Sequence, residues 1–141
     1  GMYLPHMKGE AMSKITFAID TSGSISEHEF KQFISEVHTV LKTLKPKELE
    51  VLQFDHLLQS VDTVKNVRDL AQVEFMGNGG TNPAVAINHF LESDSMALIV
   101  ITDGEFHTQC LPKVRKPVVW IIFDNQGFVP PYGKAVHISL K

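Results

Sequence analysis

The sequence predicts an α/β fold organised around a mostly parallel β-sheet. Short, almost continuous apolar runs occur at residues 15–20, 96–102 and 118–123, and such runs are typical of strands buried on both faces of a parallel sheet. Between them lie segments whose apolar residues recur at helical spacing. Strands that alternate with helices indicate right-handed crossover connections between parallel strands.

Length and composition place this fold in one soluble domain of 141 residues, of which 43% are apolar and 21% charged. The net charge is −3 and the basic residues are scattered, so nucleic acid is not an expected partner. No apolar run approaches the roughly 20 residues that cross a bilayer, so no membrane contact is expected. Cys110 is the only cysteine, which excludes an internal disulfide. We therefore expect a cytoplasmic protein, with a monomer as the default.

The amino-terminal part is predicted to contain an arm, a strand and a long helix. Residues 1–13 show mixed polarity without a period, so they are interpreted as an arm or linker before a domain that spans residues 14–141. Ser26 and Glu29 form a capping box that starts the helix. Its buried face is predicted to consist of Phe30, Phe33, Ile34, Val37, Val40, Leu41 and Leu44, and the helix ends before Pro46.

A hairpin is predicted after this helix. Residues 49–54 and 57–64 have the composition of strands, and only Asp55 and His56 separate them. Such a short connection makes the third strand antiparallel to the second. Asp55 is accordingly interpreted as a turn former rather than a ligand, as is Asp124 at the end of a later strand.

The middle of the chain is predicted to hold a second helix. Residues 67–73 are expected to form a helical turn, and the glycine-rich loop 77–81 follows. Asn82 then caps a helix that has Pro83 at its first position and that continues to Glu92.

The carboxyl-terminal part is predicted to complete the sheet. Strands at 96–102 and 118–123 are followed by a loop at 124–133, which is rich in glycine and proline, and by a last strand at 135–140. The expected sheet is thus mostly parallel with one antiparallel edge strand.

Oxygen-bearing side chains follow several of the predicted strands. The loops 20–24, 79–81 and 102–105 are expected at the carboxyl ends of the strands, where α/β sheets collect their ligands. Together they supply two carboxylates and three hydroxyls, from Asp20, Ser22, Ser24, Thr81 and Asp103. An oxygen-only set of this kind suits a hard cation such as Mg²⁺ or Mn²⁺.

These residues resemble a known family motif. The run Asp20-Thr21-Ser22-Gly23-Ser24, with Thr81 after a glycine-rich loop and Asp103 before a glycine, is similar to the metal-ion-dependent adhesion site of von Willebrand factor A (VWA) domains. The resemblance implies a three-layer, Rossmann-like fold. It also implies that Ser22, Ser24 and Thr81 bind the cation directly and that Asp20 and Asp103 bind it directly or through water. An acidic side chain of a protein partner would complete the metal shell.

A closer resemblance is to the VWA-like carboxyl-terminal domain of predicted bacterial and phage metallopeptidases. It is carried by Tyr3-Leu4-Pro5 ahead of the first strand and by Pro131-Tyr132-Gly133 ahead of the last. It implies that residues 1–13 link the domain to a peptidase-like domain. Because the chain ends just after the last predicted strand, we expect a compact version that lacks the usual last helix.

Other chemistries are weighed against this interpretation. The glycine-rich loop lacks the ending of a phosphate-binding P-loop. His28 and Glu29 open like a zinc-protease motif, but Gln32 stands where its second histidine is required. Glu105 and His107 lie just past Asp103 and are candidates for a general base. We favour a non-enzymatic, divalent-cation-dependent protein-binding module, and the alternative is an Mg²⁺- or Mn²⁺-dependent hydrolase or phosphatase that uses the same site.

Overall fold

The structure, a computed structural model, describes residues 14–22, 26–65, 70, 73–74, 80–109 and 111–139. In these residues a six-stranded sheet has the order β3-β2-β1-β4-β5-β6. The strands are β1 (Lys14–Asp20), β2 (Glu48–Phe54), β3 (Leu58–Val64), β4 (Ala97–Thr102), β5 (Val118–Phe123) and β6 (Lys134–Ile138). β3 runs antiparallel to β2, whereas the other neighbouring strands pair in parallel. The predicted mixed sheet with one antiparallel edge strand is confirmed.

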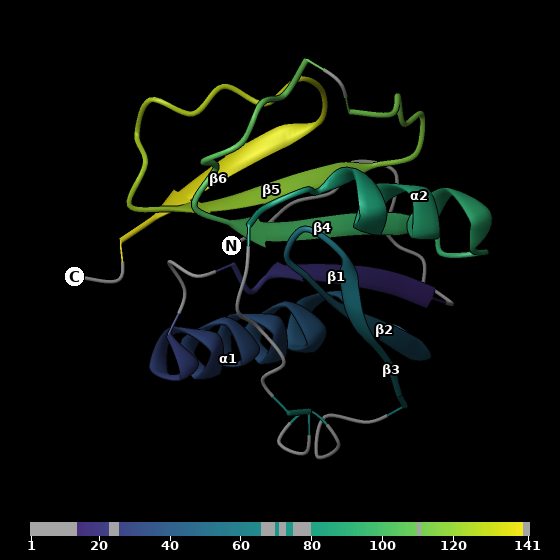
Figure 1. Ribbon diagram of the computed structural model, residues 1–141. Helices are drawn as coiled ribbons and strands as arrows, with labels where there is room; N and C mark the ends of the chain where they lie inside the picture. The colour runs from purple at the N-terminus through teal and green to yellow at the C-terminus, as the bar shows by residue number, and fades with distance from the viewer. Residues whose placement is uncertain are drawn as a thin grey trace.

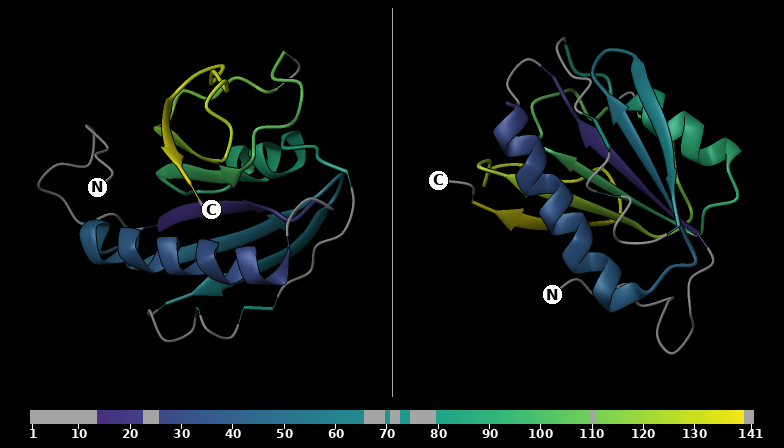
Figure 2. Two further views of the ribbon diagram at one scale, coloured as in Figure 1. Left: turned by 90° about the vertical axis from the view of Figure 1, so that its left-hand side faces the viewer. Right: turned by 90° about the horizontal axis from the view of Figure 1, so that it is seen from below.

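Two helices lie on opposite sides of this sheet, which gives three layers (Figure 1). The longer helix, α1 (Glu27–Leu44), crosses one face, and the shorter α2 (Ala84–Glu92) lies on the other (Figure 2). The predicted capping box starts α1, because Glu29 N donates to Ser26 Oγ and Ser26 N donates to Glu29 Oε1, each over 3.1 Å.

Each side of the sheet has its own apolar core. On the α1 side, Ile15, Phe17 and Ile19 of β1 pack with the helix residues Phe30, Phe33 and Val37 and with neighbouring strands. On the α2 side, Ala18 of β1 packs with Ala86, Ile87 and Phe90. Alternate residues of a strand face opposite sides, so Lys14, Thr16 and Asp20 share the α2 side with Ala18. β1 is therefore apolar towards α1 and largely polar towards α2.

The second helix begins slightly later than predicted. It starts at Ala84 with Pro83 as its N-cap, although Asn82 Oδ1 still accepts a hydrogen bond of 3.2 Å from Ala84 N. The last strand is Lys134–Ile138 rather than 135–140. Of the predicted helical turn at 67–73 only Leu70 and Val73 are described, and Val73 N donates to Leu70 O over 3.2 Å. Most of the glycine-rich loop lies outside the described residues, as do Ser24, Cys110 and the predicted arm 1–13.

An aromatic cluster covers the α2 side of β5. Its members are Phe106, Trp120, Phe128 and Tyr132, and the Trp120 ring centroid lies 5.8 to 6.0 Å from the other three. Trp120 Nε1 donates to Tyr132 O over 2.9 Å, and Tyr132 Oη donates to Pro112 O over 2.6 Å. The two loops that flank β5 are thereby fixed over the sheet on the side of α2 (Figure 2).

Candidate metal centre

Asp20 is the last residue of β1, and its side chain is fully buried. Ser22 N donates to Asp20 Oδ1 over 2.9 Å, and Thr102 Oγ1 donates to Asp20 Oδ2 over 2.6 Å. Thr102 is the last residue of the neighbouring strand β4. Both oxygens of this carboxylate are therefore held by neutral donors from two adjacent strand ends.

Burial raises the pKa of Asp20, since a desolvated carboxylate loses the hydration that favours its charged form. Hydrogen bonds from Thr102 and from the backbone and side chain of Ser22 oppose this rise, whereas the nearby charge of Asp103 adds to it. Within the described residues, Asp20 forms no ion pair with a cationic side chain. The buried carboxyl group of Asp20 thus has no positively charged partner among the described residues.

The loop that carries Asp103 is tightly held. Glu105 N donates to Asp103 Oδ1 over 3.0 Å, and Asn125 Nδ2 donates to Asp103 O over 2.8 Å. Gly104 has φ of +75°, and a Cβ at this position would lie 2.6 Å from Phe128 Cδ1. Only glycine fits this turn without a shift of the Phe128 ring.

Thr81 approaches the same edge of the sheet on a third loop. Asn82 N donates to Asp55 O over 2.7 Å, directly after β2. A Cβ built on Gly80 would lie 3.9 Å from the Cβ of His56. The carboxyl ends of β1, β2 and β4 therefore adjoin the loops that carry Ser22, Thr81 and Asp103. Ser24 and residues 77–79 fall outside the described residues.

Asp55 forms the hairpin turn, as its sequence position predicts. Its side chain is buried, and Oδ1 accepts hydrogen bonds of 3.0 Å from Leu57 N and from Gln59 Nε2. Burial alone would raise the pKa of Asp55, but these bonds and the neighbouring His56 hold it below its ordinary value. The carboxylate is therefore committed to the turn.

Sequence reasoning missed two residues of this edge. Thr102 bonds Asp20, and Asn125 bonds the backbone of Asp103. Thr102 had a readable signal, because a hydroxyl at the end of a strand beside β1 falls next to the carboxylate that ends β1. Asn125 had none, since its contact depends on how the loop after β5 folds back.

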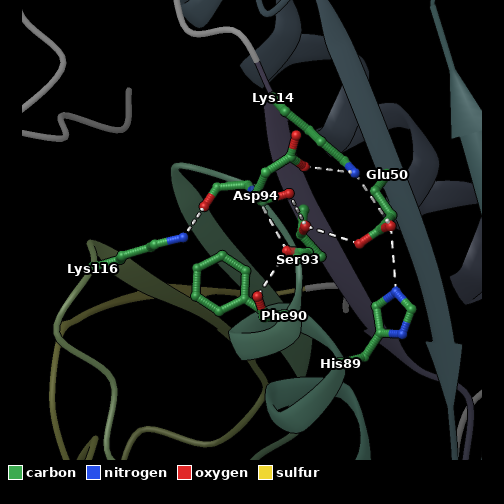
Figure 3. Close-up of polar contacts among 9 residues, drawn as sticks. Lys14, Glu50, His89, Phe90, Ser93, Asp94 and Lys116 are labelled. Carbon is green, nitrogen blue, oxygen red and sulfur yellow. Dashed lines mark hydrogen bonds and ion pairs between the residues drawn. The ribbon is translucent and has the colours of Figure 1, made fainter.

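A second polar cluster lies towards the amino end of β1, on the same side of the sheet (Figure 3). At its centre is the buried carboxylate of Glu50 in β2. Thr16 Oγ1 donates to Glu50 Oε1 over 3.1 Å, and His89 Nε2 lies 3.3 Å from Oε2. Lys14 Nζ lies 3.7 Å from Oε2 and 3.1 Å from Asp94 Oδ1. Because a carboxylate only accepts hydrogen bonds, His89 Nε2 carries the proton in its contact.

The same cluster fastens the connection between α2 and β4. Ser95 Oγ lies 2.6 Å from Thr16 Oγ1, and Ser93 Oγ donates to Phe90 O over 2.7 Å. Lys116 Nζ donates to Ser95 O over 2.7 Å and sits 5.3 Å from the centre of the Phe90 ring. These contacts hold the end of α2 against β1 and β2. The cluster therefore stabilises the packing of α2 on the sheet.

The residues at the carboxyl end fit a hard divalent cation. Asp20 and Asp103 supply negative charge, and Ser22 and Thr81 supply neutral oxygens, whereas nitrogen and sulfur ligands are absent from the predicted set. The side chain of Ser22 also forms a hydrogen bond with Asp20. Glu105 and His107 are exposed, as a solvated loop requires.

The layers, the strand order and the position of this edge together define a VWA-like, Rossmann-like domain. The chain belongs to the VWA-like domain family DUF2201, whose model matches residues 15–139. An uncharacterized protein of Thermotoga maritima is 30% identical over 132 residues, which cover 90% of this chain and 32% of that relative. The chain thus spans about a third of the length of this relative.

Two solved structures share the fold. BatB from Bacteroides thetaiotaomicron, described as a conserved hypothetical protein, aligns with a TM-score of 0.62 and 14% identity over 90% of each chain. An aerotolerance-related membrane protein from Bacteroides fragilis aligns with a TM-score of 0.55 and 15% identity over 78% of this chain and 67% of the other. At these identities the likeness concerns the fold alone. Among the helices in the described ranges, none is long and apolar enough to cross a membrane.

Proposed function

We propose that this domain is a divalent-cation-dependent protein-binding module. Mg²⁺ or Mn²⁺ would be held by Asp20, Ser22, Ser24, Thr81 and Asp103, and a carboxylate of a protein partner would complete the shell. The VWA-like fold fits a protein-interaction module. The observation that carries the proposal is the buried Asp20 carboxylate, which has only neutral donors in the described part of the chain and a second acid beside it.

Electrostatics supports a cation at this position. A buried charge is costly unless it is paired, and the nearby charge of Asp103 makes ionisation of Asp20 more costly still. Hydroxyl ligands are neutral, so they would quench the charge of a divalent cation less than further carboxylates would and leave it able to attract an acidic group. The chemistry that the ion supplies is therefore the capture of an acidic side chain rather than the activation of a substrate.

We further propose that the domain is the accessory part of a larger, peptidase-related cytoplasmic protein. The support is the relative from Thermotoga maritima, most of whose length lies outside the matched region, together with the resemblance of the Tyr3-Leu4-Pro5 and Pro131-Tyr132-Gly133 segments. In that arrangement the module would hold an acidic segment of a substrate or subunit near the catalytic domain.

Cation binding is tested by thermal unfolding with Mn²⁺ or Mg²⁺ and with EDTA. At a free cation concentration of 100 times Kd, the wild type gains about 2.7 kcal/mol, which corresponds to a rise in Tm of about 8 °C. Asp20→Ala and Ser22→Ala are expected to lose this rise. Ser26→Ala is the matched control, since it removes a nearby hydroxyl that caps α1 and should lower Tm while keeping the cation-dependent rise.

An equal Tm with millimolar cation and with EDTA would contradict the proposal. Generic phosphatase and peptidase substrates assayed with Mn²⁺ separate a binder from an enzyme. Turnover that disappears in Asp103→Ala would favour the hydrolase alternative.

The partner chemistry is tested with a random peptide library displayed on phage. Phage bound in Mg²⁺ are eluted with EDTA, and the same selection is run on Asp20→Ala. The expected result is enrichment of Asp or Glu at one peptide position for the wild type alone. Enrichment without an acidic position, or equal enrichment on the variant, would contradict a carboxylate ligand.

A further inference from the structure

Thr102 joins the two acidic loops of the candidate metal centre. It ends β4 and is fully buried. Its Oγ1 lies 2.6 Å from Asp20 Oδ2 and 3.1 Å from Gly104 N, the backbone amide directly after Asp103. One hydroxyl thus contacts the carboxylate of one acid and the main chain beside the other.

The direction of each hydrogen bond follows from the chemistry of the groups. A threonine hydroxyl has one proton and two lone pairs. The Gly104 amide only donates, so it occupies one lone pair of Thr102 Oγ1. The single proton of the hydroxyl is then directed to Asp20, whose ionised carboxylate only accepts.

This arrangement fixes the plane of the Asp20 carboxylate. Ser22 N holds Oδ1 and Thr102 Oγ1 holds Oδ2, so rotation of the carboxylate would break one bond or the other. The bond to Gly104 N also fixes the main chain where the Asp103 loop leaves β4. A change at Thr102 would therefore disturb both acids together.

We propose that Thr102 is a positioning residue of the metal centre, which sets the Asp20 carboxylate and the Asp103 loop in the arrangement that binds the cation. This inference rests on the proposed function, because it assigns a role within the same site. Removal of a hydrogen-bond partner behind a metal ligand commonly weakens metal affinity by about 10- to 100-fold. A purely structural threonine would lower stability without this loss.

Thr16 provides a matched control within the same molecule. It is also fully buried, and its Oγ1 also donates to a carboxylate, Glu50 Oε1, over 3.1 Å. It lies on β1 towards the opposite end of the sheet from Asp20. Thr16→Val therefore removes the same group from the same kind of bond, away from the candidate metal centre.

The experiment measures Mn²⁺ affinity by titration calorimetry and Tm in EDTA for the wild type, Thr102→Val, Thr102→Ser and Thr16→Val. Thr102→Val is expected to weaken Mn²⁺ binding by at least about 10-fold. Thr102→Ser keeps the hydroxyl and should bind within about 3-fold of the wild type. Thr16→Val should lower Tm and leave Mn²⁺ affinity unchanged. If Thr102→Val does not fold, Thr102→Ala is measured in its place, with the same loss expected.

Three results would overturn the inference. Wild-type affinity in Thr102→Val or its alanine replacement would show that the hydroxyl does not act on the site. An equal loss of Mn²⁺ affinity in Thr102→Ser would exclude the hydroxyl as the cause. An equal loss of affinity in Thr16→Val would show that lower stability in general weakens Mn²⁺ binding. A wild type that binds no Mn²⁺ would overturn the proposed function as well. A wild type that binds Mn²⁺ together with any of the three results above would overturn only the role of Thr102.

Discussion

The two ends of β1 each bury a carboxylate on the α2 side of the sheet, but they compensate it in different ways. At the amino end, Glu50 lies near Lys14 and His89 and accepts a hydrogen bond from Thr16. At the carboxyl end, Asp20 receives only neutral donors from the described residues and lies near the charge of Asp103. The first cluster contains a cationic side chain, Lys14, whereas Asp20 forms no ion pair within the described residues.

This difference separates a structural cluster from a binding site. Buried charges are retained at low cost when they are paired and hydrogen bonded, as at Glu50. A buried acid left without a cation is expected where an external ion supplies the missing charge. The comparison therefore predicts that neutralisation of Glu50 lowers the stability of the protein. Neutralisation of Asp20 should raise the stability when no divalent cation is present.

The largest expected effect is at the amino end. Glu50→Ala should lower the free energy of unfolding by about 3 kcal/mol, because Lys14 and His89 lose their buried partner. Urea denaturation measures this loss. Mn²⁺ affinity should stay unchanged, and Glu50→Gln, which keeps an acceptor for Thr16, should lose less. A stability equal to the wild type in Glu50→Ala would break the comparison.

A smaller effect of opposite sign is expected at the carboxyl end. Because the folded pKa of Asp20 is raised, the folded state binds its proton more tightly than the unfolded state does. Stability from this group is complete below the unfolded pKa of about 3.9 and is lost as pH rises through the folded pKa. In EDTA, Asp20→Asn should remove this loss. The free energy of unfolding of the variant should therefore rise relative to that of the wild type from pH 4 to 8.

Urea denaturation across this pH range measures the gain. A folded pKa raised by one unit above the unfolded one would give about 1.4 kcal/mol in total. Saturating Mn²⁺ should reverse the order, because only the wild type retains the carboxylate for the cation. Parallel pH profiles of the two proteins in EDTA would contradict an uncompensated charge at Asp20.

The smallest expected effect is at Lys14. Lys14→Met should cost at most about 1 kcal/mol, because Asp94 is exposed and His89 still contacts Glu50. The loss should shrink in high salt, which screens exposed pairs. Stability curves at low and high salt check this. A loss as large as that of Glu50→Ala would mean that Lys14 alone compensates the carboxylate.

Local patterns allowed most of the fold to be predicted. The capping box at Ser26 and Glu29, the short hairpin and the apolar runs are signals within a few residues, and each led to an element that the structure contains. The alternation of strands and helices predicted parallel strands, whose carboxyl ends place Asp20 and Asp103 at the same edge. The metal-ligand roles of the five site residues stay a prediction.

Contacts between distant residues were not predictable in the same way. Glu50 lies in an apolar run, and its compensation depends on Lys14 and His89, which are far from it in sequence. Nothing in the pattern around His89 distinguishes a half-buried partner of Glu50 from a surface residue. The bond between Thr102 and Asp20 likewise appears only once β4 is placed beside β1.

The aromatic cluster gives the protein a natural fluorescent reporter. Trp120 is the only tryptophan, is fully buried, and donates to Tyr132 O in surroundings formed by Phe106 and Phe128. Phe128 also packs against Gly104, next to Asp103. The emission of one indole therefore reports, without any added label, on the packing that supports the loop of the candidate metal centre.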